Sequence, residues 1–222
     1  MRKLGALALT LAFLCPALAA DPQTDDQKAF YALGVGLSKQ LAQLQPLTPQ
    51  EAEMIAAGLS DALSGKPPKA DPEAFGAKIR EIAQARMKVA GEAQKKVGAE
   101  FLEKAAKEKG AKKTESGMIY SEITPGTGDQ PKATDTVKVN YRGTLIDGTE
   151  FDSSYKRNQP ATFPLSGVIK CWTEGVQLMK VGGKSKLVCP SDIAYGDRGS
   201  PPLIKPGSTL VFEVELLSIE KK

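Results

Sequence analysis

The sequence predicts an α+β protein, in which a helical first half precedes a mainly antiparallel sheet. Up to about residue 113, apolar side chains recur at every third or fourth position, which is typical of amphipathic helices. Beyond that point apolar and polar residues alternate between glycine-containing turns, which is typical of strands. We expect four segments, namely a leader over 1–19, helices over 20–70, one long helix over 71–113 and a sheet domain over 114–222.

The first segment has the pattern of a secretory signal peptide. Arg2 and Lys3 precede an apolar run over 4–14, and Ala17-Leu18-Ala19 supplies a small-residue cleavage site. The run is too short to cross a bilayer, and we expect no later segment to insert stably in a membrane. Cleavage after Ala19 is therefore predicted. The alternative is a buried N-terminal helix, which we rank lower because a soluble helix is rarely apolar all round.

Composition excludes several classes of function. Loss of Arg2 and Lys3 removes two positive charges from a formal net charge of +4, and the remaining basic residues are mixed with acids, so nucleic acid is not an expected partner. The chain contains no histidine, which excludes His-based acid–base catalysis and His-containing metal sites. We expect neither a metal nor a cofactor.

Two cysteines, Cys171 and Cys189, remain after removal of the leader. In an oxidising compartment they are a candidate disulfide. Two separate buried thiols are the alternative, because the sequence does not fix the distance between the two Cα atoms.

Two short helices are predicted before the long one. The first begins after Asp25 and ends at Pro46, with an apolar face of Phe30, Leu33, Leu37, Leu41 and Leu44. The second begins with Thr48 as N-cap, Pro49 at the first helical position and Glu51 three residues after the cap, and Gly65 ends it.

The long helix begins at Asp71-Pro72-Glu73 and meets no breaker before Gly110, so it spans about 38 residues. Apolar residues lie near its start, and Ala, Lys, Glu and Gln dominate beyond them. This pattern predicts a solvated spacer whose first turns dock on the two short helices. Because such short helices bury little apolar area alone, we expect a homodimer through residues 20 to about 85, with a monomeric three-helix cap as the alternative.

The last segment predicts one short helix within a sheet. Alternation of Val137, Val139 and Tyr141 with polar residues indicates a strand, and Asp147-Gly148 indicates a hairpin turn. A short helix is expected over 173–180 and a strand over 184–189. Leu210, Phe212, Val214 and Leu216 line one face of the last strand.

Three stretches of this segment identify a family. They are "VKVNYRGTLIDGTEFDSS", "FPLSGVIKCWTEGVQLMKVGGKSKLVCPSDIAYGDRG" and "PGSTLVFEVELLSI". In order and spacing, residues 114–222 resemble the FKBP-type peptidyl-prolyl isomerase domain. The leader and helices resemble the Mip and FkpA group of secreted bacterial FKBPs. The resemblance implies a sheet wrapped on a short helix, a dimerising N-terminal region and a periplasmic location, with outer-membrane association and an extracellular location as alternatives.

The resemblance also implies a site. Its substrate-binding residues would be Tyr141, Phe151, Phe163, Val168, Ile169, Trp172, Ile204 and Phe212, with Trp172 as the floor. Asp152 at the pocket edge and the hydroxyl of Tyr195 would be catalytic. The backbone N–H of Ile169 and the Tyr195 hydroxyl would hold substrate carbonyls, and the loop over 197–205 would overhang the site.

Two residues depart from the family pattern. Cys171 replaces the glycine common before the tryptophan, which puts the start of the short helix in doubt. Ser200 stands where some cytosolic members have histidine, which puts substrate preference in doubt.

The implied activity is that of a proline isomerase (rotamase) that assists the folding of exported proteins. Its partners would be proline-containing, unfolded or partly folded polypeptides, and macrolides of the rapamycin type would inhibit it. Rotation about an X–Pro bond breaks no covalent bond, so the absence of a reactive nucleophile is no obstacle. The competing hypothesis is a non-catalytic holdase chaperone whose dimer binds unfolded chains.

Overall fold

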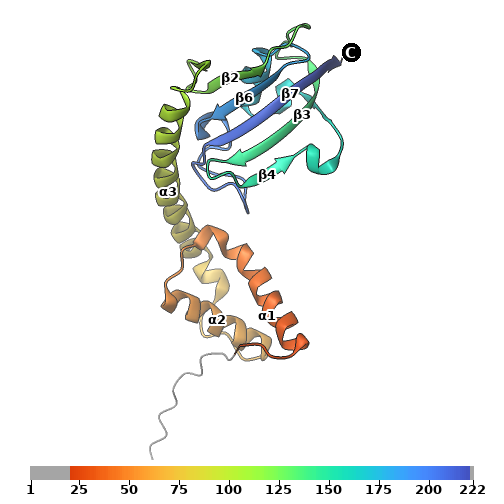
Figure 1. The fold of residues 1–222 in the computed structure, drawn as a ribbon. Helices are drawn as coiled ribbons and strands as arrows, with labels where there is room; N and C mark the ends of the chain where they lie inside the picture. The colour runs from red at the N-terminus through yellow and green to blue at the C-terminus, as the bar shows by residue number, and fades with distance from the viewer. Residues whose placement is uncertain (1–20, 221–222) are drawn as a thin grey trace, which may run out of the picture. The chain divides into compact units, whose positions relative to one another are not determined.

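The computed structural model describes residues 21–220, so the predicted signal peptide lies outside the described residues (Figure 1). The chain divides into two compact units, the first ending at Gln40 and the second beginning at Leu41. The first unit contains α1 (Asp25–Ser38), which opens with a capping box between Thr24 and Gln27. The predicted first helix is therefore present, but its α-helical part ends at Ser38. From Lys39 to Leu44 the chain continues as a 3₁₀ helix.

The second unit begins with α2 (Pro49–Leu63), whose start follows the predicted pattern. The Glu51 amide donates to the Thr48 hydroxyl at 3.3 Å, and the Thr48 amide donates to the Glu51 carboxylate at 2.8 Å. These two bonds satisfy amide groups that have no partner within the helix. Gly65, at φ 69°, follows the end of the helix in a conformation that favours glycine.

The long helix α3 (Pro72–Ala105) has 34 residues and is capped by Asp71, whose carboxylate accepts from the Glu73 amide at 2.9 Å. Arg86 on α3 forms an ion pair with Glu51 on α2. Arg86 also donates to the carbonyl of Pro46 at 3.1 Å. These polar contacts tie α2 and the segment before it to the first half of α3.

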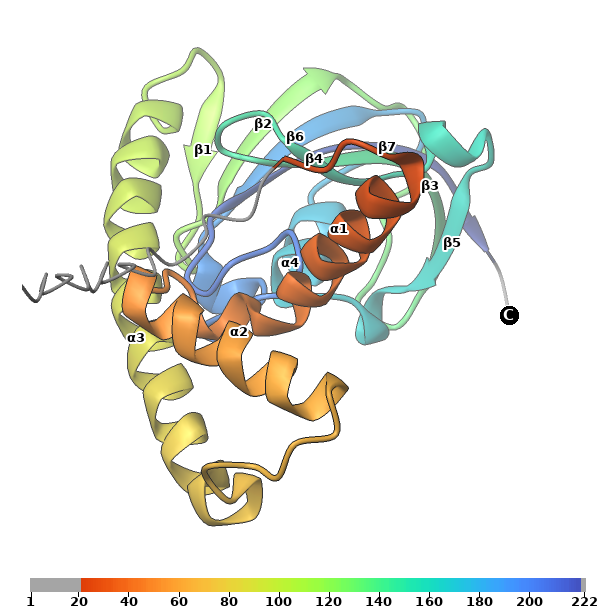
Figure 2. The same cartoon turned by 90° about the horizontal axis from the view of Figure 1, so that it is seen from below.

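The remainder of the second unit is a seven-stranded antiparallel sheet with the order β1-β2-β6-β7-β3-β4, and β5 pairs with β3. The strands are β1 (Ala111–Lys113), β2 (Ile119–Thr124), β3 (Thr136–Leu145), β4 (Glu150–Ser153), β5 (Ala161–Pro164), β6 (Lys184–Cys189) and β7 (Leu210–Glu220). The sheet curves around the short helix α4 (Lys170–Gln177), as Figure 2 shows. The α+β architecture is as predicted, although α4 begins three residues before the expected range of 173–180.

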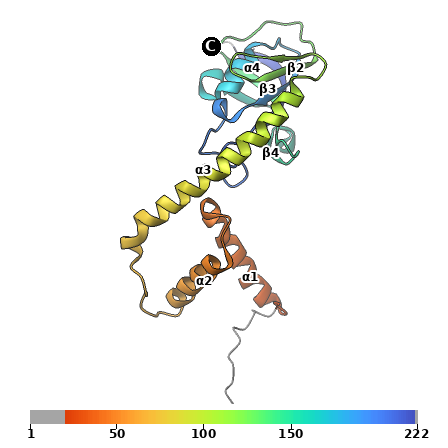
Figure 3. The ribbon, with the colours of Figure 1, turned by 90° about the vertical axis from the view of Figure 1, so that its left-hand side faces the viewer.

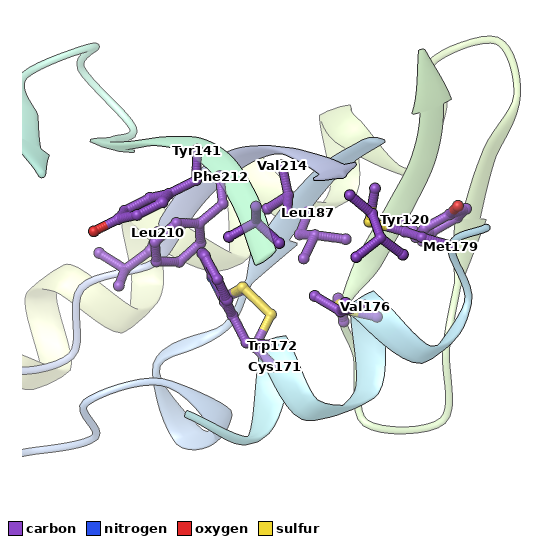
Figure 4. Packing of buried hydrophobic residues seen from close by; sticks show 14 of the residues in the cluster. Tyr120, Tyr141, Cys171, Trp172, Val176, Met179, Leu187, Leu210, Phe212 and Val214 are labelled. Carbon is purple, nitrogen blue, oxygen red and sulfur yellow. A yellow bond between two sulfur atoms is a disulfide. The ribbon is translucent and has the colours of Figure 1, made fainter. Parts of the chain in front are cut away.

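The main core lies between α4 and the sheet. Alternate residues of β3 and β7 point into it, as their 2.0-residue periodicity predicts, and Val139, Val214 and Leu216 are fully buried. Helix α4 contributes Val176 from the opposite side (Figure 4). At Gly175 a Cβ atom would lie 2.7 Å from the end of the Leu187 side chain, so a larger residue there would displace Leu187 within the core.

A second packing surface involves the C-terminal half of α3, which reaches the sheet domain (Figure 3). Ala105, Ile119 and Val188 are buried there, and Phe101 and Leu102 pack against them. Farther back on the same helix Gly91 and Gly98 are also buried. The prediction of a solvated spacer that docks through its first turns alone is therefore wrong. The docked face consists of two glycines and an alanine at intervals of seven residues, which an apolar pattern does not reveal.

Among residues 21–220, none of the helices combines the length and the apolar character that crossing a membrane requires.

Candidate active site

The site is centred on Trp172, which the first turn of α4 directs toward the sheet (Figure 4). Three aromatic rings meet the indole edge-on, with centroid distances of 5.2 Å for Tyr141, 5.4 Å for Phe212 and 5.7 Å for Phe163. Edge-to-face contacts at these distances are the favoured geometry of aromatic pairs. The indole retains 4% of its surface exposed, and its N–H has no hydrogen-bond partner within residues 21–220.

The other predicted apolar residues join the same cluster. Phe151 packs edge-on against Phe212 with ring centroids 5.6 Å apart, and Val168 and Ile169 are half-buried against the core. Ile204 comes from a distant loop and is 5% exposed. The structure thus brings together all eight residues predicted to bind substrate, although they come from β3, β4, β5, α4 with its preceding turn, β7 and a loop.

A polar network borders this cluster. The Tyr141 hydroxyl donates to one oxygen of the Asp152 carboxylate, and Arg157 donates to the other at 2.6 Å. Arg157 also donates to the Tyr141 hydroxyl at 2.8 Å, and its guanidinium lies 5.6 Å from the centroid of the Tyr141 ring. Asp152 is therefore fixed in position by two partners.

Sequence reasoning missed Arg157. Its side chain reaches Asp152 because the short 3₁₀ turn Tyr155–Arg157 follows β4, and Asn158 then takes a left-handed conformation with φ 50°. An arginine five residues after the pocket carboxylate, just before a residue type that tolerates positive φ, was the available signal.

The network shifts the protonation of its members. Burial raises the pKa of Tyr141, and the hydrogen bond to Asp152 raises it further. Burial acts to raise the pKa of Asp152 as well, but hydrogen bonds from Tyr141 and Arg157 outweigh it, so this pKa lies below its usual value. The pKa of Arg157 is raised by the hydrogen bond to Asp152. At neutral pH the site therefore holds an ionised Asp152 beside a neutral Tyr141.

Two donors at the site are free. The Ile169 amide precedes α4, and no backbone or side-chain hydrogen bond uses it within the described part of the chain. The Tyr195 hydroxyl likewise has no partner among residues 21–220, and Tyr195 is 39% exposed. Its backbone is held, because the Gly199 amide donates to the Tyr195 carbonyl at 3.1 Å. Both groups can donate a hydrogen bond to a carbonyl of a bound peptide.

Cys171 and Cys189 form a disulfide in the structure, with Cα atoms 5.8 Å apart and both side chains fully buried. The bond ties the first turn of α4 to the end of β6, one residue before Trp172 (Figure 4). Cys171 lies within α4, which begins at Lys170, so cysteine in place of the family's usual glycine is compatible with a helix that starts directly before the tryptophan.

A curved antiparallel sheet wrapped on one short helix, with an aromatic floor and a carboxylate at its edge, is the arrangement that the sequence resemblance predicts for an FKBP-type domain. Comparison with family models agrees. Residues 128–217 match the model described as FKBP-type peptidyl-prolyl cis-trans isomerase, and residues 26–121 match that of the domain amino terminal to it. The chain belongs to the FKBP-type peptidyl-prolyl cis-trans isomerase family and is an isomerase.

Proteins that are similar to this chain carry the names of FKBP-type isomerases. The FKBP-type isomerase FkpA of Escherichia coli K12 is 45% identical, over 92% of this chain and 81% of the relative. A 22 kDa FKBP-type isomerase of the same organism is 44% identical, over 88% and 96% respectively. The crystal structure of FkpA from Escherichia coli matches with a TM-score of 0.67 and 44% identity, covering 89% of this chain and 98% of that one.

Proposed function

We propose that this isomerase assists the folding of exported proteins in the periplasm, by desolvating and twisting X–Pro amides above Trp172 without covalent chemistry. Its clients would be proline-containing, unfolded or partly folded polypeptides. The observation that supports this proposal is the assembly of aromatic rings around one indole, with an ionised Asp152 fixed at the edge. Such a site offers apolar contact and oriented dipoles.

The physics of the reaction matches such a site. The X–Pro bond rotates over a barrier of about 18–20 kcal/mol, which amide resonance creates. The planar amide carries more charge separation than the twisted one, so removing water disfavours the planar form more. An acceleration of about 10⁴-fold requires a reduction of about 5.5 kcal/mol in the barrier. Desolvation together with one or two oriented hydrogen bonds is of this size.

Three groups have distinct proposed roles. The Ile169 amide and the Tyr195 hydroxyl are free donors, so each would bind a carbonyl of the peptide and fix its path over the indole. Asp152 would lie at the pocket edge, near the carbonyl of the residue before proline, and its fixed charge would act on the dipole of that carbonyl as it rotates. Because Tyr141 and Arg157 hold the carboxylate, it would need no rearrangement when the substrate twists.

Single substitutions in the full mature chain test these roles. Tyr195→Phe and Asp152→Leu should lower kcat/KM in a protease-coupled peptide assay and slow a proline-limited refolding reaction, while the melting temperature changes little. Matched controls are Tyr155→Phe, which removes a hydroxyl away from the aromatic cluster, and Asp129→Leu on an exposed loop. Unchanged rates in both site variants would refute the proposed roles.

Inhibition supplies an independent test of the pocket. A rapamycin-type macrolide should inhibit both assays and quench Trp172 fluorescence with the same concentration dependence, because the chain contains one tryptophan. Inhibition without any change in that fluorescence would place the ligand away from the proposed floor.

The protein would act as a homodimer through its N-terminal helices. On α1, Phe30, Tyr31 and Leu33 are 74%, 65% and 60% exposed. In the second unit α2, α3 and the segment before them line a largely apolar cavity of about 340 Å³, which includes Met54, Ile55, Ile79 and Ile82. Exposed apolar surface on both units favours burial against a second copy.

The same surfaces favour a second candidate function, the binding of unfolded chains. A Phe30→Asp variant separates the two functions. It should sediment as a monomer and keep peptide isomerase activity, yet lose suppression of client aggregation. A Gln40→Asp variant is the control for added charge. If Phe30→Asp still forms a dimer, α1 does not build the interface, and if it suppresses aggregation as a monomer, the holdase does not need the dimer.

A further inference from the structure

The face of α3 that meets the sheet domain contacts one particular loop. This loop, which we call the site loop, spans residues 190–209 and carries both Tyr195 and Ile204. Gly91 lies against Pro206 and Gly207, and Gly98 lies against Thr209. A Cβ atom at Gly91 would be 3.4 Å from Pro206, and one at Gly98 would be 3.1 Å from the Thr209 Cβ. The helix backbone itself therefore packs on the C-terminal half of the loop.

Lys95 completes this face and contacts the other half of the loop. It lies four residues after Gly91 and three before Gly98, a spacing that places all three on one side of a helix. Its ammonium group is 2.7 Å from the Asp197 carboxylate and 3.1 Å from that of Asp192. The two acids flank Tyr195 in the sequence, so one lysine holds both sides of the segment that presents the free hydroxyl.

The site loop needs such external support. Three of its glycines have positive φ, namely 57° at Gly196, 65° at Gly199 and 73° at Gly207. Glycine has more backbone freedom than other residues, so without tertiary contacts this loop would sample many conformations. One hydrogen bond links its halves near α3, from the Gly207 amide to the Gly196 carbonyl at 2.9 Å. A contact on α3 is therefore connected to the residue next to Tyr195.

We propose that Lys95 is a positioning residue for the isomerase reaction, which holds the site loop so that Tyr195 and Ile204 meet the peptide in a fixed arrangement. The inference rests on the proposed role of this loop in substrate binding. Lys95 touches neither the aromatic cluster nor any reacting atom. The pKa of Lys95 is raised by its hydrogen bonds to Asp197 and Asp192, so the side chain is charged over the working range of pH.

Exposed ion pairs of this kind contribute little to global stability, so their loss should free the loop and leave the fold intact. In the full mature chain, Lys95→Met should lower kcat/KM on a proline-containing tetrapeptide anilide by about threefold to tenfold. This loss matches the small free energy that two exposed ion pairs contribute together. Amide hydrogen exchange in peptides covering 190–209 should become faster, while the melting temperature stays near that of the wild type.

The controls separate positioning from a general effect of charge. Lys95→Arg keeps the charge and should restore both kcat/KM and exchange protection. Lys96→Met removes a neighbouring exposed lysine that forms no ion pair within residues 21–220, and it should behave as wild type. Added salt should reduce wild-type activity toward the level of Lys95→Met and have little effect on the variant itself.

Three results would overturn the inference, namely unchanged loop exchange in Lys95→Met, faster exchange with no loss of kcat/KM, or an equal loss in Lys96→Met. Tyr195→Phe, measured alongside, tests the proposed role of the hydroxyl separately. Full activity of Tyr195→Phe together with an impaired Lys95→Met would reject that role and still support positioning of the loop through Ile204.

Discussion

Breaking the disulfide between Cys171 and Cys189 is expected to lower the stability of the sheet domain by about 3 kcal/mol. The bond closes a loop across a sequence separation of 18 residues, and in the chain-entropy model a loop of this size restricts the unfolded chain by that amount. Both cysteine side chains are fully buried, so reduction should change the packing of the surrounding core very little. For a domain of about 100 residues, this change corresponds to a fall of roughly 15 °C in melting temperature.

The measurement compares oxidised protein with protein that has been reduced in denaturant and refolded with reductant present. Circular dichroism follows the melting of each sample. A Cys171→Ala/Cys189→Ala double variant should melt near the reduced protein and show no further shift with reductant. Isomerase activity at 25 °C should be largely retained, because Tyr141, Phe163 and Phe212 still surround Trp172.

Equal melting temperatures for the oxidised and reduced proteins would refute this reasoning. The bond would then impose strain in the folded state that cancels its effect on the unfolded chain. A large loss of activity at 25 °C, without unfolding, would show instead that the aromatic contacts alone do not hold the indole in place.

Three further predictions concern separate features. Gly98→Val should destabilise the protein to urea by about 1–3 kcal/mol, because the new side chain overlaps Thr209, whereas Ala99→Val on the exposed side should not. Activity should be constant from about pH 5 to pH 9, because the pKa of Asp152 lies below its usual value and the pKa of Tyr141 lies above its usual value. The stabilisation by ionised Asp152 is present above its unfolded pKa and is lost as pH falls through its folded pKa. A bell-shaped profile near neutrality would contradict the assignment. Arg157→Met should lower kcat/KM about threefold to tenfold and move the acid limb of the profile to higher pH, and an unshifted limb would show that Arg157 does not control Asp152.

Much of this fold could be predicted from the sequence, because the residues that determine these elements lie close together in the chain. The capping box at Thr48 and Glu51 fixes the start of α2 by hydrogen bonds three residues apart. Alternation along β3 and β7 shows which side chains face α4, because strand geometry sends successive residues to opposite faces. The predicted pocket residues came from a family resemblance, and they lie together because those strands and α4 take the expected positions.

Other features depend on contacts that no local pattern contains. Gly91 and Gly98 dock α3 through backbone atoms, so this part of the docked face has no apolar side chains that a periodic pattern could reveal. Arg157 belongs to the site because a turn with left-handed Asn158 returns it toward Asp152. The change from α to 3₁₀ geometry at Lys39 likewise follows no breaker in the sequence.

The edges of the sheet have a consequence for the proposed work of this isomerase among unfolded polypeptides. Its main strand order ends in β1 and β4, which are three and four residues long, and β5, which pairs with β3 alone, has four residues and ends in a proline. The first carries exposed Lys112 and Lys113, and the second carries Glu150, which pairs with Arg142 and Lys156. Short edge strands, two of them charged and one closed by a proline, give an extended foreign chain little backbone to pair with, which would protect a folding catalyst from aggregating with its clients.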